Sequence, residues 1–186
     1  LLGDLDGARR CYEAAVAAGE RVGNTTAVAV VHNNIGEVLL TQGNVDDAIA
    51  HFERVVETHE RQGDPLAAAG LALVNLSRAF QARGDYASAL ERLDRGMSLL
   101  RQAGAAAIMT EALLQHAELD LERGQPGAAR RTCTRALQEA RDLGARLLQA
   151  RGLRILGRIK MAAGQQGEAD ALLRESIGLA TAAGAD

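Results

Sequence analysis

Glycines recur along this chain at a fixed interval of about 40 residues, in two interleaved sets. The first set is Gly3, Gly43, Gly84, Gly124 and Gly164, and the second is Gly23, Gly63, Gly104, Gly144 and Gly184. Members of each set are 40 or 41 residues apart. A fixed period in this range is typical of a solenoid, in which each repeat packs only against its neighbours.

The segments between glycines have the apolar spacing of amphipathic helices. In the segment after Gly43, apolar side chains fall three or four positions apart, at Val45, Ile49, Phe52, Val55 and Val56. Glycine itself suits the position after a helix end, where the backbone turns left-handed and a Cβ atom would clash. The sequence therefore predicts an all-α run of antiparallel helices of about 18 residues each.

Residues that start helices follow several of the glycines. Asn44 and Asp85 are good N-caps, because their side chains can accept hydrogen bonds from the first backbone N–H groups. Asp64–Pro65 and Gln125–Pro126 place proline in the first turn, where its missing N–H costs nothing. These signals predict where helices begin.

Small residues also recur at one place in the repeat. Five positions after each glycine of the first set comes Ala8, Ala48, Ala89, Ala129 or Ala169. Nine positions after it comes Tyr12, Phe52, Leu93, Cys133 or Leu173. Small residues let two helices cross closely, and the larger residue fills the space beside the crossing.

The composition limits the possible functions. Apolar residues make up 47% of the chain and charged residues 24%, so we expect a soluble, globular protein. The net charge of -3 disfavours nucleic-acid binding, and no apolar run is long enough to span a membrane. Cys11 and Cys133 are far apart and fit no metal or redox spacing, which predicts a reducing, cytoplasmic compartment.

No catalytic or cofactor motif is visible. The four histidines are scattered among different predicted helices: His32, His51, His59 and His116. There is no zinc-protease motif, no serine or cysteine nucleophile with a supporting histidine, and no phosphate-binding glycine loop after a strand. The sequence therefore predicts neither an enzyme nor a cofactor or metal site.

The repeat resembles the tetratricopeptide repeat. In the second unit the resemblance rests on Ile35–Gly36, Leu39, Gly43, Ala48, Phe52 and Val55, and in the third on Leu76, Phe80, Gly84, Ala89 and Leu93. The common unit is about 34 residues long, and the longer unit of this chain looks like those of kinesin light chains, Pins-type adaptors, and arrays in bacterial regulators and signalling ATPases. The resemblance implies a right-handed superhelical α-solenoid of antiparallel helix pairs, whose concave groove binds a peptide or protein segment.

The glycines divide the chain into repeats of a single array, residues 1–186. Residues 1–23 are the second half of a truncated repeat, and 24–63, 64–104, 105–144 and 145–184 are full repeats. We expect the chain to be a fragment of a longer protein. Asp120 and Lys160 replace the aromatic residue of the first helix in adjacent repeats, and an ion pair between them is possible.

The resemblance also assigns residues to the groove. These are Asn33, Asn34, Glu37, Val74, Asn75, Arg78, Gln115, Glu118, Arg151, Arg154 and Arg158. Asn34, Asn75 and Gln115 occupy the same place in three consecutive repeats, and a carboxamide can pair with any peptide unit. Two interpretations stay open: the amides hold the backbone of a ligand, or they bond across repeats.

Charged residues form two rows in adjacent first helices. One row is Arg151, Arg154 and Arg158, and the other is Glu111, Glu118 and Glu122. The arginines can bind an acidic ligand group, or the two rows can pair with each other; we favour pairing, because the rows should be neighbours.

The last helix has apolar residues that no following repeat covers, among them Leu172, Leu173, Ile177 and Leu179. Terminal repeats normally need a polar outer face. We therefore expect a protein-interaction module of a larger bacterial regulator or scaffold. The alternative is a structural or self-association segment, acting as a spacer or homodimer interface without a ligand of its own.

Overall fold

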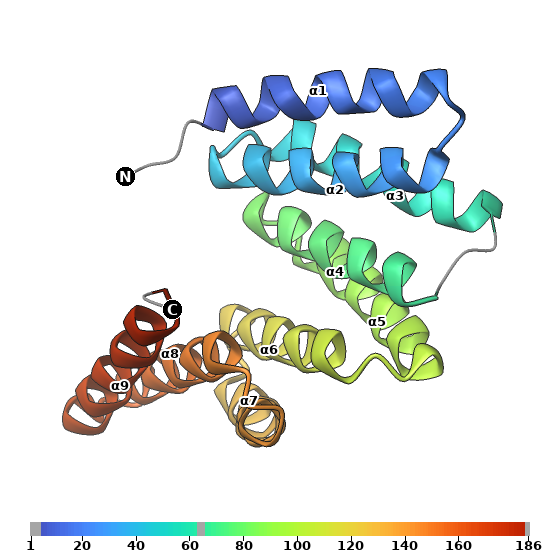
Figure 1. Ribbon diagram of the computed structural model, residues 1–186. Coiled ribbons are helices and arrows are strands. Elements are labelled where there is room, and N and C mark those ends of the chain that lie inside the picture. Colours follow the sequence, from blue (N-terminus) through green and yellow to red (C-terminus); the bar gives the residue numbers. More distant parts are fainter. Residues whose placement is uncertain (1–4, 63–65, 185–186) are drawn as a thin grey trace. The chain divides into compact units, whose positions relative to one another are not determined.

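The computed structural model describes residues 5–62 and 66–184 of the chain. In these ranges the chain folds into helices joined by short turns, and no strand is present (Figure 1). The helices are α1 (Leu5–Arg21), α2 (Thr25–Thr41), α3 (Val45–Gln62), α4 (Leu66–Ala82), α5 (Tyr86–Ala103), α6 (Ala106–Glu122), α7 (Pro126–Asp142), α8 (Arg146–Ala162) and α9 (Gln166–Gly184). The prediction of an all-α solenoid of helix pairs is confirmed.

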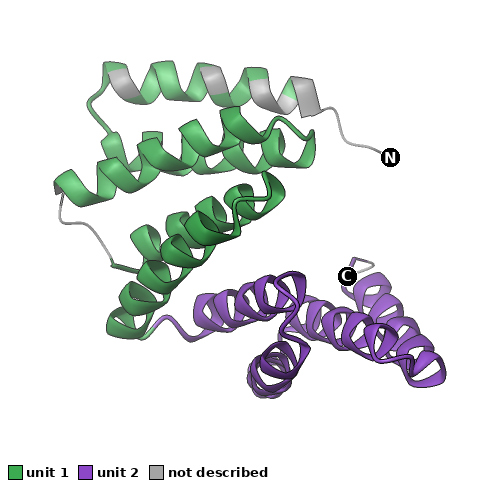
Figure 2. Cartoon of the chain, turned by 180° about the vertical axis from the view of Figure 1, so that it is seen from behind, with its two compact units in different colours: residues 1–104 green, residues 105–186 purple. Residues whose placement is uncertain are grey.

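The chain divides into two compact units (Figure 2). Unit 1 is Leu1–Gly104 and unit 2 is Ala105–Asp186, so the division falls between two of the expected repeats. In unit 1, consecutive helices from α1 to α5 pack on one another, and α2 also contacts α4. In unit 2, consecutive helices from α6 to α9 pack on one another, and α6 also contacts α8. No helix in the described ranges is both long and apolar enough to cross a membrane.

The recurring glycines end helices as predicted. Seven of them have a left-handed backbone, with φ between 64° and 83°: Gly23, Gly43, Gly84, Gly104, Gly124, Gly144 and Gly164. After α4, the Gly84 N–H donates to the Gln81 carbonyl over 2.9 Å, and the Asp85 N–H reaches back to Phe80 over 3.0 Å. These bonds satisfy carbonyls at the helix end that have no partner within the helix. Gly3 and Gly63 lie outside the described residues, and Gly184 is the last residue of α9.

Caps start some of the helices. The Asp85 carboxylate accepts the Ser88 N–H over 3.1 Å at the start of α5, as predicted. The hydrogen bond with Ser88 lowers the pKa of the Asp85 carboxyl below its usual value, with a further contribution from Arg83. Pro126 occupies the first turn of α7, but Gln125 forms no side-chain cap. Asp64–Pro65 lies outside the described residues.

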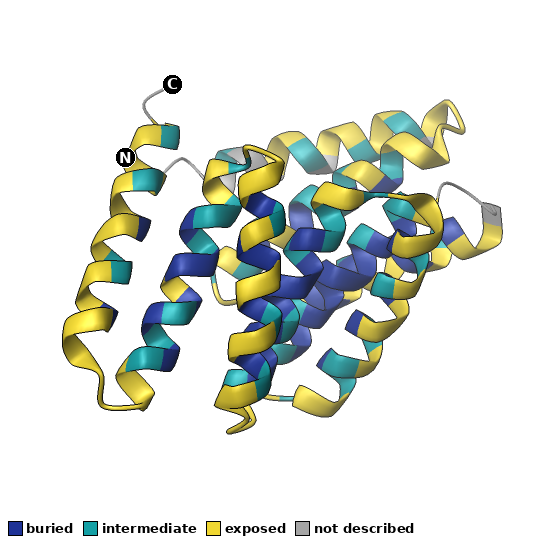
Figure 3. Ribbon diagram, turned by 90° about the horizontal axis from the view of Figure 1, so that it is seen from below, coloured by how far each residue is buried: buried dark blue, intermediate teal, exposed yellow. Residues whose placement is uncertain are grey.

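The small residues mark close helix crossings, as predicted. Ala48, Ala89, Ala129 and Ala169 are all fully buried, and the described core of each unit lies between its helices (Figure 3). At Gly36 of α2, a Cβ atom would lie only 2.6 Å from the buried ring of Phe52 in α3. This approach is possible because the helix has no side chain at that point.

Candidate interaction surface

The first helices of the repeats expose a polar face in each unit, which we call the first-helix face. In unit 1 it is formed by Asn33, Asn34 and Glu37 of α2 and Asn75 and Arg78 of α4. In unit 2 it is formed by Glu111, Gln115, Glu118 and Glu122 of α6 and Arg151, Arg154 and Arg158 of α8. The helical period places residues three, four and seven positions apart on one side of a helix, which is why these side chains share a face.

In unit 1 the centre of the face is the Asn75 carboxamide, which is buried and bonded across the repeats. Its Nδ2 donates to Asn33 Oδ1 over 2.9 Å and lies 3.4 Å from Glu37 Oε1. Its Oδ1 accepts from the Arg78 guanidinium over 3.2 Å. Arg78 and Glu37 approach to 3.9 Å. The amide of Asn75 is therefore used within the protein, because both its donor and its acceptor have partners.

Asn34 and Val74 differ from this pattern. Asn34 is half-buried, and within the part of the chain that the structure describes its side chain has no hydrogen-bond partner. Val74 is fully buried in the core of unit 1 and presents no surface to a ligand. Of the polar groove residues expected in unit 1, Asn34 is the one whose side chain forms no bond within the described part of the protein.

In unit 2 the charged rows pair across the repeats. Glu118 accepts from Arg151 over 2.6 Å and from Arg154 over 2.7 Å. Gln115 is buried, and its Oε1 accepts from the Arg151 guanidinium over 2.6 Å. The outer members approach less closely: Arg151 lies 3.8 Å from Glu111, and Arg158 lies 3.6 Å from Glu122. The expectation that the two rows pair with each other is confirmed.

The arginines of unit 2 are not equally available. The Arg151 side chain is 19% exposed and lies between Gln115 and Glu118, whereas the side chains of Arg154 and Arg158 are 49% and 39% exposed. A buried ion pair with two arginines on one carboxylate is costly to break, because it would leave a charge without a partner in a dry environment. Arg154 and Arg158 are therefore the arginines that a ligand can reach.

One ion pair that the sequence left possible is not formed. Asp120 and Lys160 do not pair with each other: the Asp120 carboxylate lies 3.3 Å from His116 Nδ1, and Lys160 pairs with Glu168 over 2.8 Å. Each residue has a partner nearer in sequence. The partner of Asp120 is one helical turn away in α6, and the partner of Lys160 is across the turn in α9. Histidines of two different helices also meet, because the Nδ1 atoms of His32 in α2 and His51 in α3 lie 2.9 Å apart.

The histidine pair does not extend to a metal centre. In residues 5–62 and 66–184, no group of three or more His, Cys, Asp or Glu side chains is arranged to hold a metal ion. Cys133 is buried and donates its thiol hydrogen to the Gly152 carbonyl over 3.2 Å. Burial raises the pKa of the Cys133 thiol to about 12, and the negative charge of Glu118 adds to the rise. A thiol in this state is a poor nucleophile, because the thiolate is the reactive form.

The tetratricopeptide repeat model matches residues 1–58 and, in an overlapping match, residues 27–102. This chain belongs to the tetratricopeptide repeat family. Tetratricopeptide repeats generally mediate protein–protein interaction or scaffolding, and theirs is not a catalytic fold. No curated protein matches the sequence of the chain.

Solved structures of repeat proteins have the same fold. BtubC (BKLC) from P. vanneervenii matches with a TM-score of 0.77 at 15% sequence identity, over 98% of this chain and 75% of that one. A putative kinesin light chain from Podosopora anserina with nearly identical TPR-like repeats matches with a TM-score of 0.67 at 18% identity, over 97% and 89%. A signal-transduction ATPase with numerous domains and a tetratricopeptide repeat sensor, from Pyrococcus horikoshii, matches with a TM-score of 0.70 at 13% identity, over 94% of this chain and 27% of that one. At such low identity these matches show the fold alone.

Proposed function

We propose that this chain is an interaction module that binds a peptide or protein segment on the first-helix face of its units. The family supports an interaction role, and the polar atoms that remain available on the face support the site. Catalysis is not part of the proposal, because no arrangement of nucleophile, base and stabilising donor is present on this face.

The observation that carries the proposal is the half-buried amide of Asn34, which has no partner in the described part of the chain. The polar atoms of Asn34 are not among the buried side-chain atoms that lack a partner, so water reaches them and a ligand can reach them too. Next to it in sequence, Asn33 is held by Asn75. The Asn34 amide can therefore pair with the N–H and C=O of a ligand backbone, while the neighbouring network keeps α2 and α4 in register.

In unit 2 the ligand contact would be ionic. Arg154 and Arg158 each form one ion pair with a glutamate and keep the remaining donors of the guanidinium group. A guanidinium group has five N–H donors, so a carboxylate of the ligand can bind without breaking the pairs with Glu118 and Glu122. The two units would thus recognise a backbone and an acidic side chain, respectively.

The test is a selection of peptides from a random library displayed on phage, with the complete chain as bait. Enriched peptides are then synthesised, and their affinity is measured by fluorescence anisotropy. We expect Asn34→Ala to lower the affinity for the peptides roughly tenfold. Arg154→Ala should lower the affinity for acidic peptides most. Each substitution removes a donor that contacts the ligand. The unfolding midpoint of Asn34→Ala should stay near that of the wild type. Arg154→Ala removes one of the two partners of Glu118 and leaves Arg151, so its midpoint should fall, and circular dichroism checks that the variant is folded when binding is measured.

A matched control is Gln42→Ala at the end of α2, which changes an amide of the same helix outside the first-helix face. It should bind the selected peptides like the wild type. If Asn34→Ala and Arg154→Ala both bind them like this control, the first-helix face is not the binding site.

We further propose that the module serves a larger bacterial regulator or scaffold in the cytoplasm. The similarity to a Pyrococcus signal-transduction ATPase that has a tetratricopeptide repeat sensor, of which the match covers 27%, supports the context of a larger regulator. A measurement of which proteins copurify with the chain in its own cells tests this part of the proposal.

A second candidate function is self-association through α9, which one observation favours. Ile177 is 66% exposed, the second most exposed of the large apolar side chains in the described residues. A homodimer would cover it. Sedimentation over a range of concentrations tests this: association that Ile177→Glu abolishes and Asn34→Ala leaves unchanged would support the second candidate over the first.

A further inference from the structure

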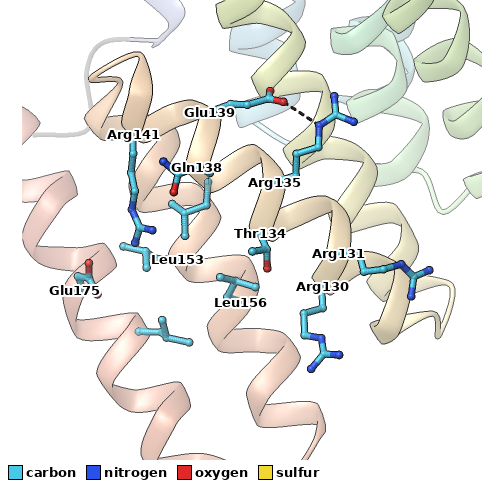
Figure 4. A pocket seen from close by; sticks show the side chains of 12 residues that line it. Arg130, Arg131, Thr134, Arg135, Gln138, Glu139, Arg141, Leu153, Leu156 and Glu175 are labelled. Atoms are coloured by element: carbon cyan, nitrogen blue, oxygen red, sulfur yellow. Dashed lines mark hydrogen bonds and ion pairs between the residues drawn. The ribbon is translucent and has the colours of Figure 1, made fainter.

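Unit 2 has a second concave surface, away from the first-helix face, which we call the outer groove (Figure 4). It is a groove of about 1000 Å³ between α7 and α9, with α8 beneath. In the described residues, α7 and α9 each pack on α8 but not on each other. The outer groove therefore exists because two second helices, α7 and α9, pack on one first helix, α8, and are spaced apart from each other.

Leucines form the floor of the outer groove. They are Leu137 of α7, Leu153 and Leu156 of α8, and Leu172 of α9. Leu156 and Leu172 are half-buried, so part of their apolar surface faces the open groove. Apolar surface of this kind is stabilised when another apolar group covers it.

The rim of the outer groove carries an excess of positive charge, although the whole chain has a net charge of -3. Four arginines of α7 line it, Arg130, Arg131, Arg135 and Arg141, against two glutamates, Glu139 and Glu175. Arg135 is paired with Glu139 over 2.9 Å. The other three arginines have no ion-pair partner among the residues that the structure describes. Their guanidinium groups are available to a ligand.

Unit 1 shows how the same gap can be closed. Between α3 and α5 it is bridged by an ion pair of Glu60 and Arg95. By their distance from the second set of glycines, the equivalent residues of unit 2 are Arg141 and Glu175, with the charges exchanged. Figure 4 shows both at one end of the outer groove, with Arg130 and Arg131 at the other. No ion pair between Arg141 and Glu175 is formed in the described structure, so this gap stays open.

We propose that the outer groove docks an acidic amphipathic helix of a partner protein. A helix with apolar residues three and four positions apart presents a narrow apolar stripe, which matches a leucine floor between two helices. Glutamates or aspartates beside the stripe would meet Arg130, Arg131 and Arg141 as bidentate ion pairs. The leucine floor favours this partner over a nucleic acid, whose phosphates would contact the rim and leave the floor uncovered. This site is separate from the first-helix face and does not depend on it.

The probe is a fluorescein-labelled peptide of about 18 residues, helical by design, with leucines three and four positions apart and glutamates on both sides. Two control peptides replace the glutamates by lysines or the leucines by serines. Fluorescence anisotropy with the complete chain measures binding. We expect the first peptide to bind, and each control peptide to bind at least roughly tenfold more weakly, because charge and apolar contact are both required.

Variants of the chain locate the site. One variant carries both Arg130→Glu and Arg131→Glu, and another carries Leu172→Asn. Each should lower the affinity for the leucine–glutamate peptide roughly tenfold. The matched control is Arg123→Glu with Arg174→Glu, which makes the same change in charge at exposed arginines of unit 2 outside the groove and should bind within about twofold of the wild type. The arginine variants change exposed side chains, so their unfolding midpoints should stay close to that of the wild type.

Three results would overturn the proposal. The first is absence of binding by the leucine–glutamate peptide, or equal binding of all three peptides. The second is equally tight binding of single-stranded DNA that is lost in the arginine double variant but not in Leu172→Asn, which would identify a polyanion site. The third is dimerisation of the wild-type chain that the arginine double variant abolishes, because the occupant would then be a second copy of the chain.

Discussion

At the scale of single residues, the same residue type has opposite roles at equivalent positions of the repeat. Asn75 is buried and bonded to residues of two helices, while Asn34 is half-buried and has no side-chain partner in the described residues. Asn75 lies beside α2, and its amide donates to Asn33 and Glu37 of that helix. A residue's place in the repeat is therefore not enough to assign its function.

This difference predicts opposite stability effects for one substitution. Asn75→Ala should lower the free energy of unfolding by about 1–3 kcal/mol, because it removes the hydrogen bonds to Asn33 and Arg78 and leaves their polar atoms without that partner. Asn34→Ala should change it by less than about 0.5 kcal/mol. Urea unfolding followed by circular dichroism measures both. Equal losses in the two variants would show that the Asn34 amide has a structural role.

The two thiols predict one reactive cysteine in the native chain. Cys11 is exposed, whereas Cys133 is buried and its raised pKa of about 12 keeps it protonated. Without denaturant, a disulfide reagent should react with the exposed Cys11 and not with Cys133. In urea both should react.

The Cys11→Ser variant isolates the buried thiol. Its remaining cysteine should be unreactive until the chain unfolds. Because the folded pKa of Cys133 lies above its unfolded value near 9.0, its stabilising contribution is complete below about pH 9 and is lost as the pH rises toward 12. Fast reaction of Cys133 at pH 8 without denaturant would contradict its burial.

At the scale of helices, left-handed glycines end most elements, while the starts are less uniform. Asp85 caps α5 and Asn24 caps α2, but α6, α7 and α8 begin without a side-chain cap. The helix ends could be predicted because a left-handed turn strongly requires glycine. The starts could be predicted only in part, because packing against neighbouring helices can replace a cap.

The cap of α5 predicts a pH effect. The carboxyl of Asp85 has a lowered pKa in the folded chain, so its stabilising contribution is complete above its usual value of 3.8 and is lost as the pH falls through the lower folded value. Asp85→Ala should increase hydrogen exchange of the Ser88 amide at neutral pH. Asp85→Asn should keep the cap and remove its pH dependence.

Gln125→Ala is the control for the cap, because Gln125 forms no side-chain bond at the start of α7. It should leave hydrogen exchange in α7 unchanged. An Asp85→Ala variant with wild-type exchange at Ser88 would mean that packing alone determines where α5 begins.

At the scale of the whole molecule, the described helices of each unit pack on their neighbours in the chain, and the first helices of adjacent repeats within a unit also contact each other. In such an array, stability is the sum of repeat terms and nearest-neighbour terms. A substitution should therefore affect mainly the helix that carries it and the neighbouring helices. Whether it raises or lowers the free energy of unfolding should depend on the atoms that the new side chain contacts.

Two glycine-to-alanine substitutions test this. At Gly36 a Cβ atom would lie 2.6 Å from the buried Phe52 ring, so Gly36→Ala should destabilise by about 1–3 kcal/mol through overpacking, less the gain of about 1 kcal/mol in helix propensity. At Gly178 a Cβ atom would meet nothing within 4 Å, so Gly178→Ala should stabilise by up to about 1 kcal/mol. Unfolding in urea measures the sign, and hydrogen exchange should show the effect of Gly36→Ala in α2 and α3. A stabilising Gly36→Ala would contradict the close crossing.

The sequence by itself determined the family, the helical array, the glycine stops and the buried alanines. These features can be predicted from the order of residues along the chain. A fixed repeat places equivalent residues on equivalent helix faces and puts adjacent first helices side by side. Only the tertiary structure decided that Asn75 and Gln115 are bonded internally, that His32 meets His51, that Lys160 pairs with Glu168, and that an arginine-rimmed groove lies between α7 and α9. Those outcomes depend on the rotation and offset of neighbouring helices by a few ångströms, and a period along the chain does not specify them.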